Sequence, residues 1–287
     1  MGLTQCQLAV GDLIFDARLC GPEGGAVVVL LHGWPEFSSW WQDSLEALGA
    51  AGYRAVAFDQ RGYSRGARPL DVAEYCPDRL VDDVLGIADA VGAQSFHMVA
   101  HDWGGMVAWA LATSHPERIK SLTVLSTPHP VALQESRKAD PTQDHRLDYV
   151  RFFRLRDGSP EKALLADGAR RLRAAFDPRV PKGLVDEAAQ RLAEPGALSA
   201  TLNWYRAVDD DLYVPAGEVR APTLRRSTSK PHFVRILARP EPLKGLYVLD
   251  RERGVARGDD TVLLQAFQQA IDRLTTNADH HCEILLR

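Results

Sequence analysis

The sequence lacks the features of a membrane, secreted or metal-binding protein. No apolar run in its 287 residues is long enough to span a bilayer. The N-terminus has no basic segment followed by an apolar stretch, so we expect no signal peptide. The four cysteines, Cys6, Cys20, Cys76 and Cys282, form no Cys-x-x-Cys pair, which argues against a metal site and a disulfide framework. A reducing cytoplasm is the location that this pattern favours.

An excess of positive charge is also absent. There are 34 lysines and arginines against 38 aspartates and glutamates, and the net charge is -4. We therefore expect neither nucleic acid nor an anionic membrane as a partner. Hydrophobic residues make up 45% and charged residues 25%, as in ordinary globular proteins. Nothing in the sequence implies a metal or an organic cofactor, and both a monomer and a homodimer remain open.

Short apolar runs alternate with helical stretches along the first half of the chain. The strands expected from these runs cover residues 8–19 (one or two strands around a turn at 11–12), 26–31, 53–58, 95–100, 122–126, 219–224 and 245–249. The expected helices cover about 40–51 (preceded by Ser38 and Ser39), 78–91, 106–112, 161–176, 184–192 and 261–274. Such alternation predicts the α/β class with a doubly wound, mostly parallel sheet.

The pattern changes in the middle of the chain. Between about residues 131 and 216 there are no strand-like runs, and the sequence pattern is typical of helices. Asp177-Pro178 and residues 194–196 (Glu-Pro-Gly) mark breaks between these helices. We interpret residues 131–216 as a helical cap inserted into a core formed by residues 1–130 and 217–287. The length of the chain suffices for one large α/β domain with such an insertion.

One stretch has the pattern of a nucleophile elbow. The apolar run 96–100 ends abruptly in His101-Asp102, and two glycines and a helical stretch follow. Strand, sharp turn and helix are the setting of G-x-S-x-G, and here Ala100, Asp102 and Gly104 take its three fixed positions. A carboxylate at the apex can attack carbon and form an ester. The alternative is that Asp102 only caps the helix that follows.

Three chemically rich segments follow expected strands. They are residues 32–36, 101–103 and 127–130. Since binding sites of doubly wound sheets gather at the carboxyl ends of strands, we expect these segments to share one edge of the sheet.

The motifs at 32–35 (His-Gly-Trp-Pro), 101–105 (His-Asp-Trp-Gly-Gly) and 203–206 (Asn-Trp-Tyr-Arg) carry a family resemblance. The chain resembles the α/β-hydrolases of the epoxide hydrolase and haloalkane dehalogenase branch, and is closer to the epoxide hydrolases. The resemblance implies that Asp102 is the nucleophile and that the backbone N–H groups of Trp34 and Trp103 form an oxyanion hole.

The same resemblance gives roles to the loop before the elbow. His32, Gly33 and Pro35 would shape it, with a cis peptide between Trp34 and Pro35 that aims the loop at the nucleophile. For His101 we expect a packed residue that supports the elbow.

Two cap tyrosines are also implied. Tyr205 matches the tyrosine of the 203–206 motif, and Tyr149 resembles its partner. Opening an epoxide produces an alkoxide, a poor leaving group, and two phenol O–H groups would protonate and stabilise it. The alternative for each tyrosine is an aromatic wedge with its hydroxyl at the surface. We interpret Trp204 as a packing residue.

The last part of the chain departs from the family pattern. Lys230 stands where the family has an acid, Arg225 and Arg226 interrupt an apolar strand, and no histidine follows within residues 249–258. Three explanations stay open: a natural variant that binds without hydrolysing, a base from elsewhere, or a locally altered reading frame. The candidate bases are His232, His280 and His281, but we favour the interpretation that all three are surface histidines. We interpret Asp250, Asp259 and Asp260 as solvent-exposed charges in loops or at the start of a helix.

The function implied is that of an epoxide hydrolase. Asp102 would open an apolar epoxide through an alkyl-enzyme ester, Tyr149 and Tyr205 would assist, and water would release a vicinal diol. The alternatives are a catalytically impaired binding protein with this fold and a haloalkane dehalogenase, which would use Trp103 for halide. An aspartate at the apex argues against a serine esterase.

Overall fold

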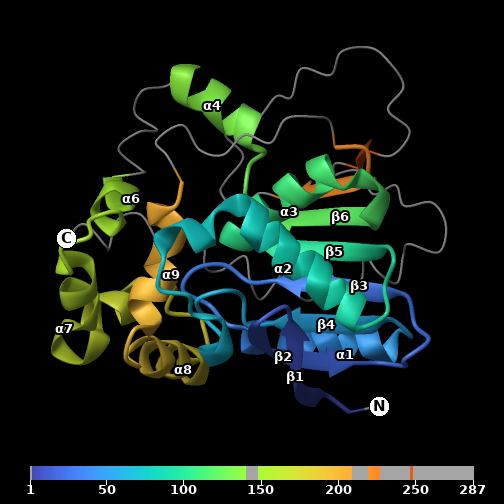
Figure 1. Cartoon of the computed structure of the whole chain (residues 1–287), viewed down its shortest axis with the longest axis horizontal. Coiled ribbons are helices and arrows are strands. Elements are labelled where there is room, and N and C mark those ends of the chain that lie inside the picture. Colours follow the sequence, from blue (N-terminus) through green and yellow to red (C-terminus); the bar gives the residue numbers. More distant parts are fainter. Residues whose placement is uncertain (1, 140–147, 209–218, 227–245, 248–287) are drawn as a thin grey trace.

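A mixed sheet of eight strands forms the centre of the molecule (Figure 1). The computed structural model describes residues 2–139, 148–208, 219–226 and 246–247. The strands are β1 (Thr4–Val10), β2 (Leu13–Cys20), β3 (Val27–Leu31), β4 (Arg54–Phe58), β5 (Phe96–His101), β6 (Ile119–Leu125), β7 (Thr223–Arg226) and β8 (Leu246–Tyr247). Their order is β1-β2-β4-β3-β5-β6-β7-β8. The pairs β1–β2 and β2–β4 are antiparallel, and the pairs from β4 to β8 are parallel.

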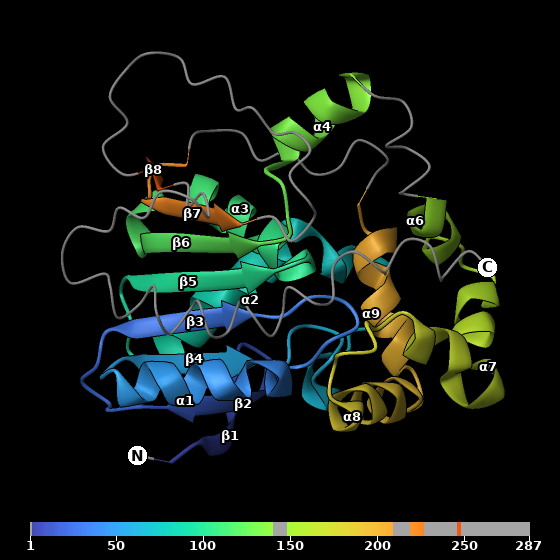
Figure 2. The ribbon, with the colours of Figure 1, turned by 180° about the vertical axis from the view of Figure 1, so that it is seen from behind.

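Helices cover both faces of this sheet. The α-helices are α1 (Gln42–Ala50), α2 (Pro77–Ala90), α3 (Trp103–Ser114), α4 (Pro130–Ala139), α6 (Asp148–Phe153), α7 (Ser159–Ala174), α8 (Lys182–Leu192) and α9 (Ala197–Arg206). Short 3-10 helices are η1 (Ser38–Trp41), η2 (Arg65–Ala67), η3 (Val72–Tyr75) and η4 (Pro116–Arg118). Helix α1 lies on one face, and α2 and α3 lie on the other (Figures 1 and 2). This is the doubly wound α/β arrangement that the sequence predicts.

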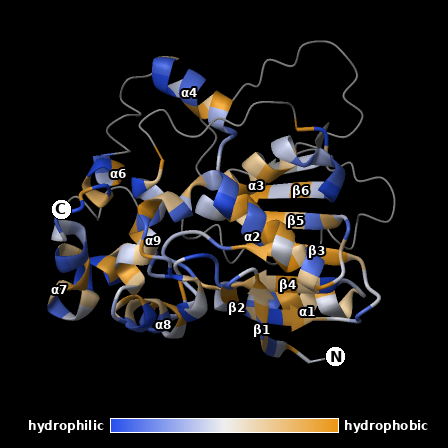
Figure 3. Cartoon of the chain, viewed as in Figure 1, coloured by the Kyte–Doolittle hydropathy of each residue, from blue (hydrophilic) through white to orange (hydrophobic). Residues whose placement is uncertain are grey.

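The central strands are apolar because both of their faces are covered. All five residues of β3 are buried, and Val28, Val29 and Leu30 have no exposed surface. Burying each such side chain contributes about 1.5–3 kcal/mol relative to leaving it in water. Figure 3 shows the same pattern, with hydrophobic strands in the centre and hydrophilic residues on the outer helices.

The sheet has its topological switch point at β3. The chain passes from β3 to β4 on one side and then crosses to β5 on the other side, so β3 lies between them. The loops after β3 and β5 therefore leave the sheet in opposite directions and open a crevice at their carboxyl ends. Residues 32–36 follow β3, and Asp102 follows β5, so the two segments meet there.

The structure describes five α-helices between β6 and β7: α4, α6, α7, α8 and α9, which we call the helical insert. Helices α6 to α9 stand beside the carboxyl ends of the parallel strands (Figures 1 and 2). Trp204 of α9 is buried, and its indole N–H donates to the Arg61 carbonyl in the loop after β4, at 2.8 Å. Trp204 is thus a packing residue between insert and sheet, as expected.

Most strand predictions are confirmed where residues are described, with small differences at the ends. The strand expected over 219–224 is instead β7, Thr223–Arg226, which includes both arginines. β1 begins at Thr4, earlier than expected. The helical stretch expected after Ser39 starts as the 3-10 helix η1, which includes both serines and leads into α1. One helix prediction is wrong. The helix expected over 161–176 is broken, because Asp167, Gly168 and Ala169 have positive φ angles. The expected helix at 261–274 lies outside the described residues.

Candidate active site

The turn at Asp102 has the geometry of a nucleophile elbow. Asp102 has φ 51° and ψ -122°, which is an unfavourable conformation for a residue with a side chain. Its side chain makes no capping bond to the helix that follows, so the alternative that Asp102 is a helix cap is not supported. Instead its carbonyl accepts hydrogen bonds from the backbone N–H of Gly105 at 2.8 Å and from the Thr127 hydroxyl at 2.9 Å. These bonds hold the strained residue at the apex.

The two glycines after the elbow allow close packing of strand and helix. A Cβ on Gly104 would lie 2.6 Å from the Leu31 carbonyl oxygen. A Cβ on Gly105 would lie 2.6 Å from Oγ1 of Thr127. Both approaches are shorter than any real Cβ contact, so only glycine lets α3 start this close to β3 and β6.

The loop after β3 lies directly against Asp102. The backbone N–H of Trp34 donates to Oδ1 of Asp102 at 2.8 Å, and the Trp34-Pro35 peptide is cis, as expected. A Cβ on Gly33 would lie 2.4 Å from Cβ of Asp102, so this position has to be glycine. Trp103 is the first residue of α3, and the first N–H groups of a helix have no partner within it. The geometry thus places one proposed oxyanion-hole donor on the carboxylate and the other beside it.

The His32 ring links the loop after β3 to the loop after β4 by hydrogen bonds. Its Nε2 accepts the Gln60 backbone N–H at 3.1 Å, so the proton is on Nδ1, which donates to the Gly33 carbonyl at 2.9 Å. The Gln60 side chain returns a bond to the His32 carbonyl at 2.7 Å. Burial lowers the pKa of His32, which keeps the ring neutral. His32 therefore bonds to the loop after β3 and to the loop after β4 as a neutral ring.

Sequence reasoning missed Glu36, which forms a buried pair with His101. Oε2 of Glu36 accepts the Gly33 N–H at 3.2 Å and lies 3.1 Å from Nδ1 of His101. Burial opposes both charges, but the mutual attraction outweighs it, so the pKa of Glu36 is lowered and that of His101 is raised. The pair joins the loop to the residue before the nucleophile, which confirms His101 as support for the elbow. The position of Glu36 directly after Pro35 was the available signal.

Both predicted tyrosines lie in the insert with their rings in contact, and Tyr205 lies close enough to Asp102 for the carboxylate to affect its pKa. Tyr205, at the end of α9, is buried, and its ring centroid is 6.2 Å from that of Tyr149 in α6. The ring of Tyr205 also packs against those of Trp103 and Trp34, with distances between ring centroids of 4.9 Å and 5.9 Å. Burial, followed by the neighbouring Tyr149 and Asp102, raises the pKa of Tyr205 well above its usual value. Tyr205 therefore keeps its proton at neutral pH and can donate it.

Phe153 is a further residue of this cluster that the sequence did not single out. Its ring is fully buried and lies 4.8 Å from Trp34, 5.1 Å from Tyr205 and 5.5 Å from Tyr149, between ring centroids. Phe153 thus joins the oxyanion-hole loop to both tyrosines and makes the surroundings apolar. Its place four residues after Tyr149, on the same side of a helix, was the only hint.

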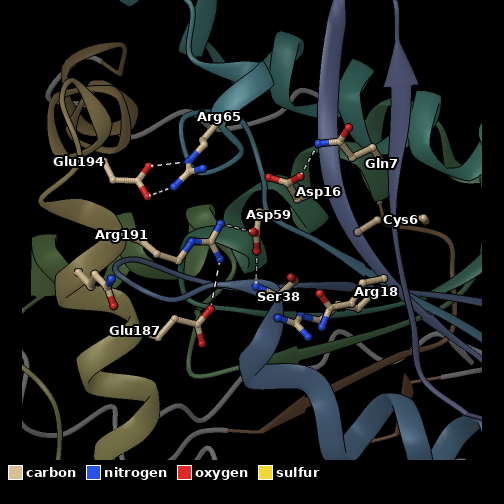
Figure 4. Close-up of a pocket in the computed structure, with 13 residues that line it drawn as sticks. Cys6, Gln7, Asp16, Arg18, Ser38, Asp59, Arg65, Glu187, Arg191 and Glu194 are labelled. Atoms are coloured by element: carbon tan, nitrogen blue, oxygen red, sulfur yellow. Dashed lines mark hydrogen bonds and ion pairs between the residues drawn. The ribbon is translucent and has the colours of Figure 1, made fainter.

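A polar pocket of about 660 Å³ lies elsewhere, between the edge of the sheet and α8 (Figure 4). Arg191 donates to Asp59 at 2.5 Å, and Arg65 donates to Glu194 at 2.6 Å across it. The Arg191 guanidinium also lies 3.9 Å from the ring centroid of Phe37. None of the candidate site residues lines this pocket. Its paired charges fasten the insert to the core.

Some candidates lie outside the described residues. They are Lys230, His232, Asp250, Asp259, Asp260, His280 and His281. Within the described part of the chain, no group of three or more His, Cys, Asp or Glu residues could hold a metal ion. No described helix is both long and apolar enough to cross a membrane.

Comparisons with known proteins agree with this geometry. The family model described as alpha/beta hydrolase fold matches residues 26–210. The AB hydrolase superfamily protein YfhM of Bacillus subtilis (strain 168) is 37% identical over 211 residues, 71% of this chain and 73% of that protein. Epoxide hydrolase 4 of Mus musculus is 32% identical over 233 residues, 77% of this chain. The match spans 64% of the mouse protein, which is less than two thirds of its length.

Solved structures show the same fold. One of them, described as novel epoxide hydrolases from metagenomes of hot environments, has a TM-score of 0.66 and 28% identity, and covers 78% of this chain and 82% of that one. The fold, the elbow and the family model together show that this chain belongs to the α/β-hydrolase superfamily, close to the epoxide hydrolases.

Proposed function

We propose that this protein is a hydrolase of the epoxide hydrolase type with Asp102 as its nucleophile. Oδ2 of Asp102 attacks one carbon of an apolar epoxide, the ring C–O bond breaks, and the ring oxygen takes a proton from Tyr205 or Tyr149. The product of this step is an ester between Asp102 and a 2-hydroxyalkyl group. Water then adds to the ester carbonyl carbon, and collapse of the intermediate breaks its bond to the alkyl oxygen, which releases the vicinal diol and restores the carboxylate. The proton that water gives up returns to the tyrosinate.

The observation that carries the proposal is that the two oxygens of the Asp102 carboxylate have different hydrogen-bonding environments. Oδ1 is held by the Trp34 N–H at 2.8 Å, whereas Oδ2 has no hydrogen-bond partner among the described residues. The oxygen that is held becomes the ester carbonyl oxygen, and the same donor stabilises it as an oxyanion when water adds. The free oxygen is the one that attacks carbon.

The two phenols complete the chemistry of ring opening. An alkoxide needs a proton as it leaves, and each neutral tyrosine O–H supplies a donor within the same apolar cluster. The raised pKa of Tyr205 keeps that donor protonated. A halide needs no proton, so the tyrosine pair favours epoxides over haloalkanes as substrates.

We propose that the helical insert is the cap of this site. It contributes Tyr149, Phe153 and Tyr205, and residues 131–216 are the part of the chain that separates the two halves of the core. Its aromatic side chains exclude water from the reacting carbons, which strengthens the electrostatic interactions within the site.

Hydrolysis of the ester needs a base, and the sequence has no histidine at the place where the family has one. General base catalysis contributes about 10² to 10⁴-fold, so without it the second step is slow. We therefore expect a stoichiometric burst of epoxide consumption, followed by a persistent alkyl-enzyme. Sustained turnover would contradict this expectation, and replacing His232, His280 and His281 one at a time would then locate the base.

The test of the proposed activity is a substrate panel. Purified protein is incubated with styrene oxide, 1,2-epoxyhexane and 1-bromohexane, and epoxide loss, diol formation and bromide release are followed. We expect epoxide consumption of at least one equivalent per chain and no bromide release. Bromide release without any reaction of the epoxides would refute the assignment in favour of a haloalkane dehalogenase.

A further inference from the structure

Two arginine side chains form hydrogen bonds between the ends of α6 and α9, the helices that contain Tyr149 and Tyr205. Nε of Arg154, which directly follows α6, donates to the backbone carbonyl of Tyr205 at 3.0 Å. In the opposite direction, Nη2 of Arg206, the last residue of α9, donates to the backbone carbonyl of Leu155 at 2.7 Å. Each bond satisfies a carbonyl near the end of a helix, where the backbone has no partner of its own. We call this reciprocal pair the arginine clasp.

The clasp is anchored in the interior by a third contact. Nη2 of Arg206 also bonds Oε1 of Glu161 at 2.9 Å, and the Ser199 hydroxyl donates to the same oxygen at 2.8 Å. The Arg206 side chain is only 6% exposed. Burial favours the neutral carboxyl of Glu161, but the bonds from Ser199 and Arg206 outweigh it and lower its pKa. Glu161 thus keeps its charge and holds the guanidinium in one place.

The anchor is poorly explained as a device for stability. Oε2 of Glu161 and Nε of Arg206 are buried without a partner among the described residues. A buried ion pair with unsatisfied atoms contributes little net stability, because desolvation offsets the attraction. What the pair does provide is direction, since the planar guanidinium bonds a carbonyl and a carboxylate at fixed angles.

The helices that it joins need such a fixed point. α6 has six residues and carries both Tyr149 and Phe153. A helix of this length does not persist by itself in water, so its position depends on contacts with its neighbours. Its rings lie 6.2 Å (Tyr149) and 5.1 Å (Phe153) from the ring of Tyr205, the residue whose carbonyl Arg154 binds.

We propose that Arg154 and Arg206 are positioning residues, which set the phenols of Tyr149 and Tyr205 at the spacing that ring opening requires. This inference rests on the proposed epoxide hydrolase function. The arginines touch no substrate and act only through the helix ends that bear the two tyrosines.

The test compares Arg154→Gln and Arg206→Lys with Arg151→Gln as the matched control. Arg151 lies on α6 as well, but its side chain is 71% exposed and bonds Asp148 of the same helix at 3.1 Å. Lysine at 206 keeps the charge for Glu161 but loses the fixed planar geometry in which Nη2 donates to both Glu161 and the Leu155 carbonyl while Nη1 donates to Asn203. The rate of alkyl-enzyme formation with styrene oxide is measured by quench and intact-protein mass, together with the melting temperature.

We expect Arg154→Gln and Arg206→Lys to lower the alkylation rate at saturating epoxide about tenfold to hundredfold, because a misplacement near 1 Å costs about that much. The half-saturating concentration should change less than threefold, and Arg151→Gln should behave as wild type. Wild-type rates in both clasp variants would overturn the proposal. The proposal would also be overturned if each variant alkylates as fast as the wild type when the two are compared at temperatures where they are equally folded, because the slower rate would then reflect unfolding alone.

A second readout does not depend on activity. Spectrophotometric titration of the tyrosines follows phenol ionisation directly. Burial also raises the pKa of Tyr63 and Tyr75, so the difference between each protein and its Tyr205→Phe variant isolates the ionisation of Tyr205. Loosening the end of α9 admits water, so both clasp variants should bring the ionisation of Tyr205 closer to that of an ordinary tyrosine. An unchanged titration would overturn the proposal even if the wild type opens no epoxide. A wild type without alkylation but with the expected shift would refute the proposed function alone.

Discussion

The close approach of Gly33 to Asp102 makes a sharp test of the site. In Gly33→Ala the new Cβ would lie 2.4 Å from Cβ and 2.7 Å from Oδ1 of Asp102. Ordinary contacts of a Cβ begin near 3.4 Å, so loop and elbow have to separate by about 1 Å. Neither partner is the flexible end of a long side chain, and the elbow is held by hydrogen bonds from Gly105 and Thr127.

That separation acts directly on the bond between the Trp34 N–H and Oδ1 of Asp102. Stretching it from 2.8 Å by about 1 Å removes it as a hydrogen bond. In the alkylation step this bond orients the carboxylate so that Oδ2 faces the epoxide carbon, and a misplacement of the nucleophile by about 1 Å costs about 10²-fold in rate. We therefore expect alkyl-enzyme formation from styrene oxide to slow by at least about 10²-fold.

The assay is a quenched-flow time course of intact-protein mass, with Gly24→Ala as the control. Gly24 has no atom within 4 Å of its ideal Cβ, so the same substitution there should leave the rate within twofold of wild type. If Gly33→Ala alkylates as fast as Gly24→Ala, with an unchanged melting temperature, then the loop does not position Asp102 and the site described here is wrong.

Three further predictions concern the tyrosines, the pH dependence and the buried phenyl ring. Tyr149→Phe and Tyr205→Phe should each leave partial ring opening and the double variant should abolish it, because one remaining donor still reaches the oxygen; equal activity in the double variant, measured by epoxide loss, would remove both residues from the mechanism. The hydrogen bond from Arg65 holds the pKa of Glu194 at about 2, so its contribution to stability is complete above an unfolded pKa of 4.5 and is lost as the pH falls towards 2. Between pH 4.5 and 2 the melting temperature of Glu194→Gln should therefore fall less than that of the wild type. Identical slopes of melting temperature against pH would show that this ion pair does not couple to folding. Phe153→Ala should lower the melting temperature and shift the preference from 1,2-epoxyhexane towards bulkier epoxides such as trans-stilbene oxide, whereas an unchanged ratio of rates would place Phe153 outside the substrate space.

The fold followed from the sequence because its strands are buried on both faces. Residues 26–31 and 55–58 are continuous apolar runs, as expected for strands that have a neighbour on each side and helices on both faces. The break in α7 did not follow, since apolar residues on either side of Asp167 keep the helical period and only the backbone angles reveal the turn. Periodicity reports which side chains are buried and is insensitive to a local reversal of φ.

The site was predictable to the extent that it lies in contiguous motifs. Asp102, Trp34 and Tyr205 are each marked by their sequence neighbours, and the structure brings them together. The partners of Glu36 and Phe153 are far away in the chain, so their contribution depends on tertiary contacts that one sequence does not encode locally. The same holds for Arg154, whose acceptor is a backbone carbonyl 51 residues away.

The measurement that tests the central claim most directly is the location of the covalent adduct. Wild-type protein and Asp102→Asn are incubated with styrene oxide, quenched in acid, digested and analysed by mass spectrometry. The variant should fold, because asparagine is nearly isosteric with aspartate and tolerates the positive φ at this position. We predict a mass increase of one substrate on the peptide that contains Asp102 in the wild type and none in the variant. The same adduct on another peptide, or equal labelling of Asp102→Asn, would contradict the account.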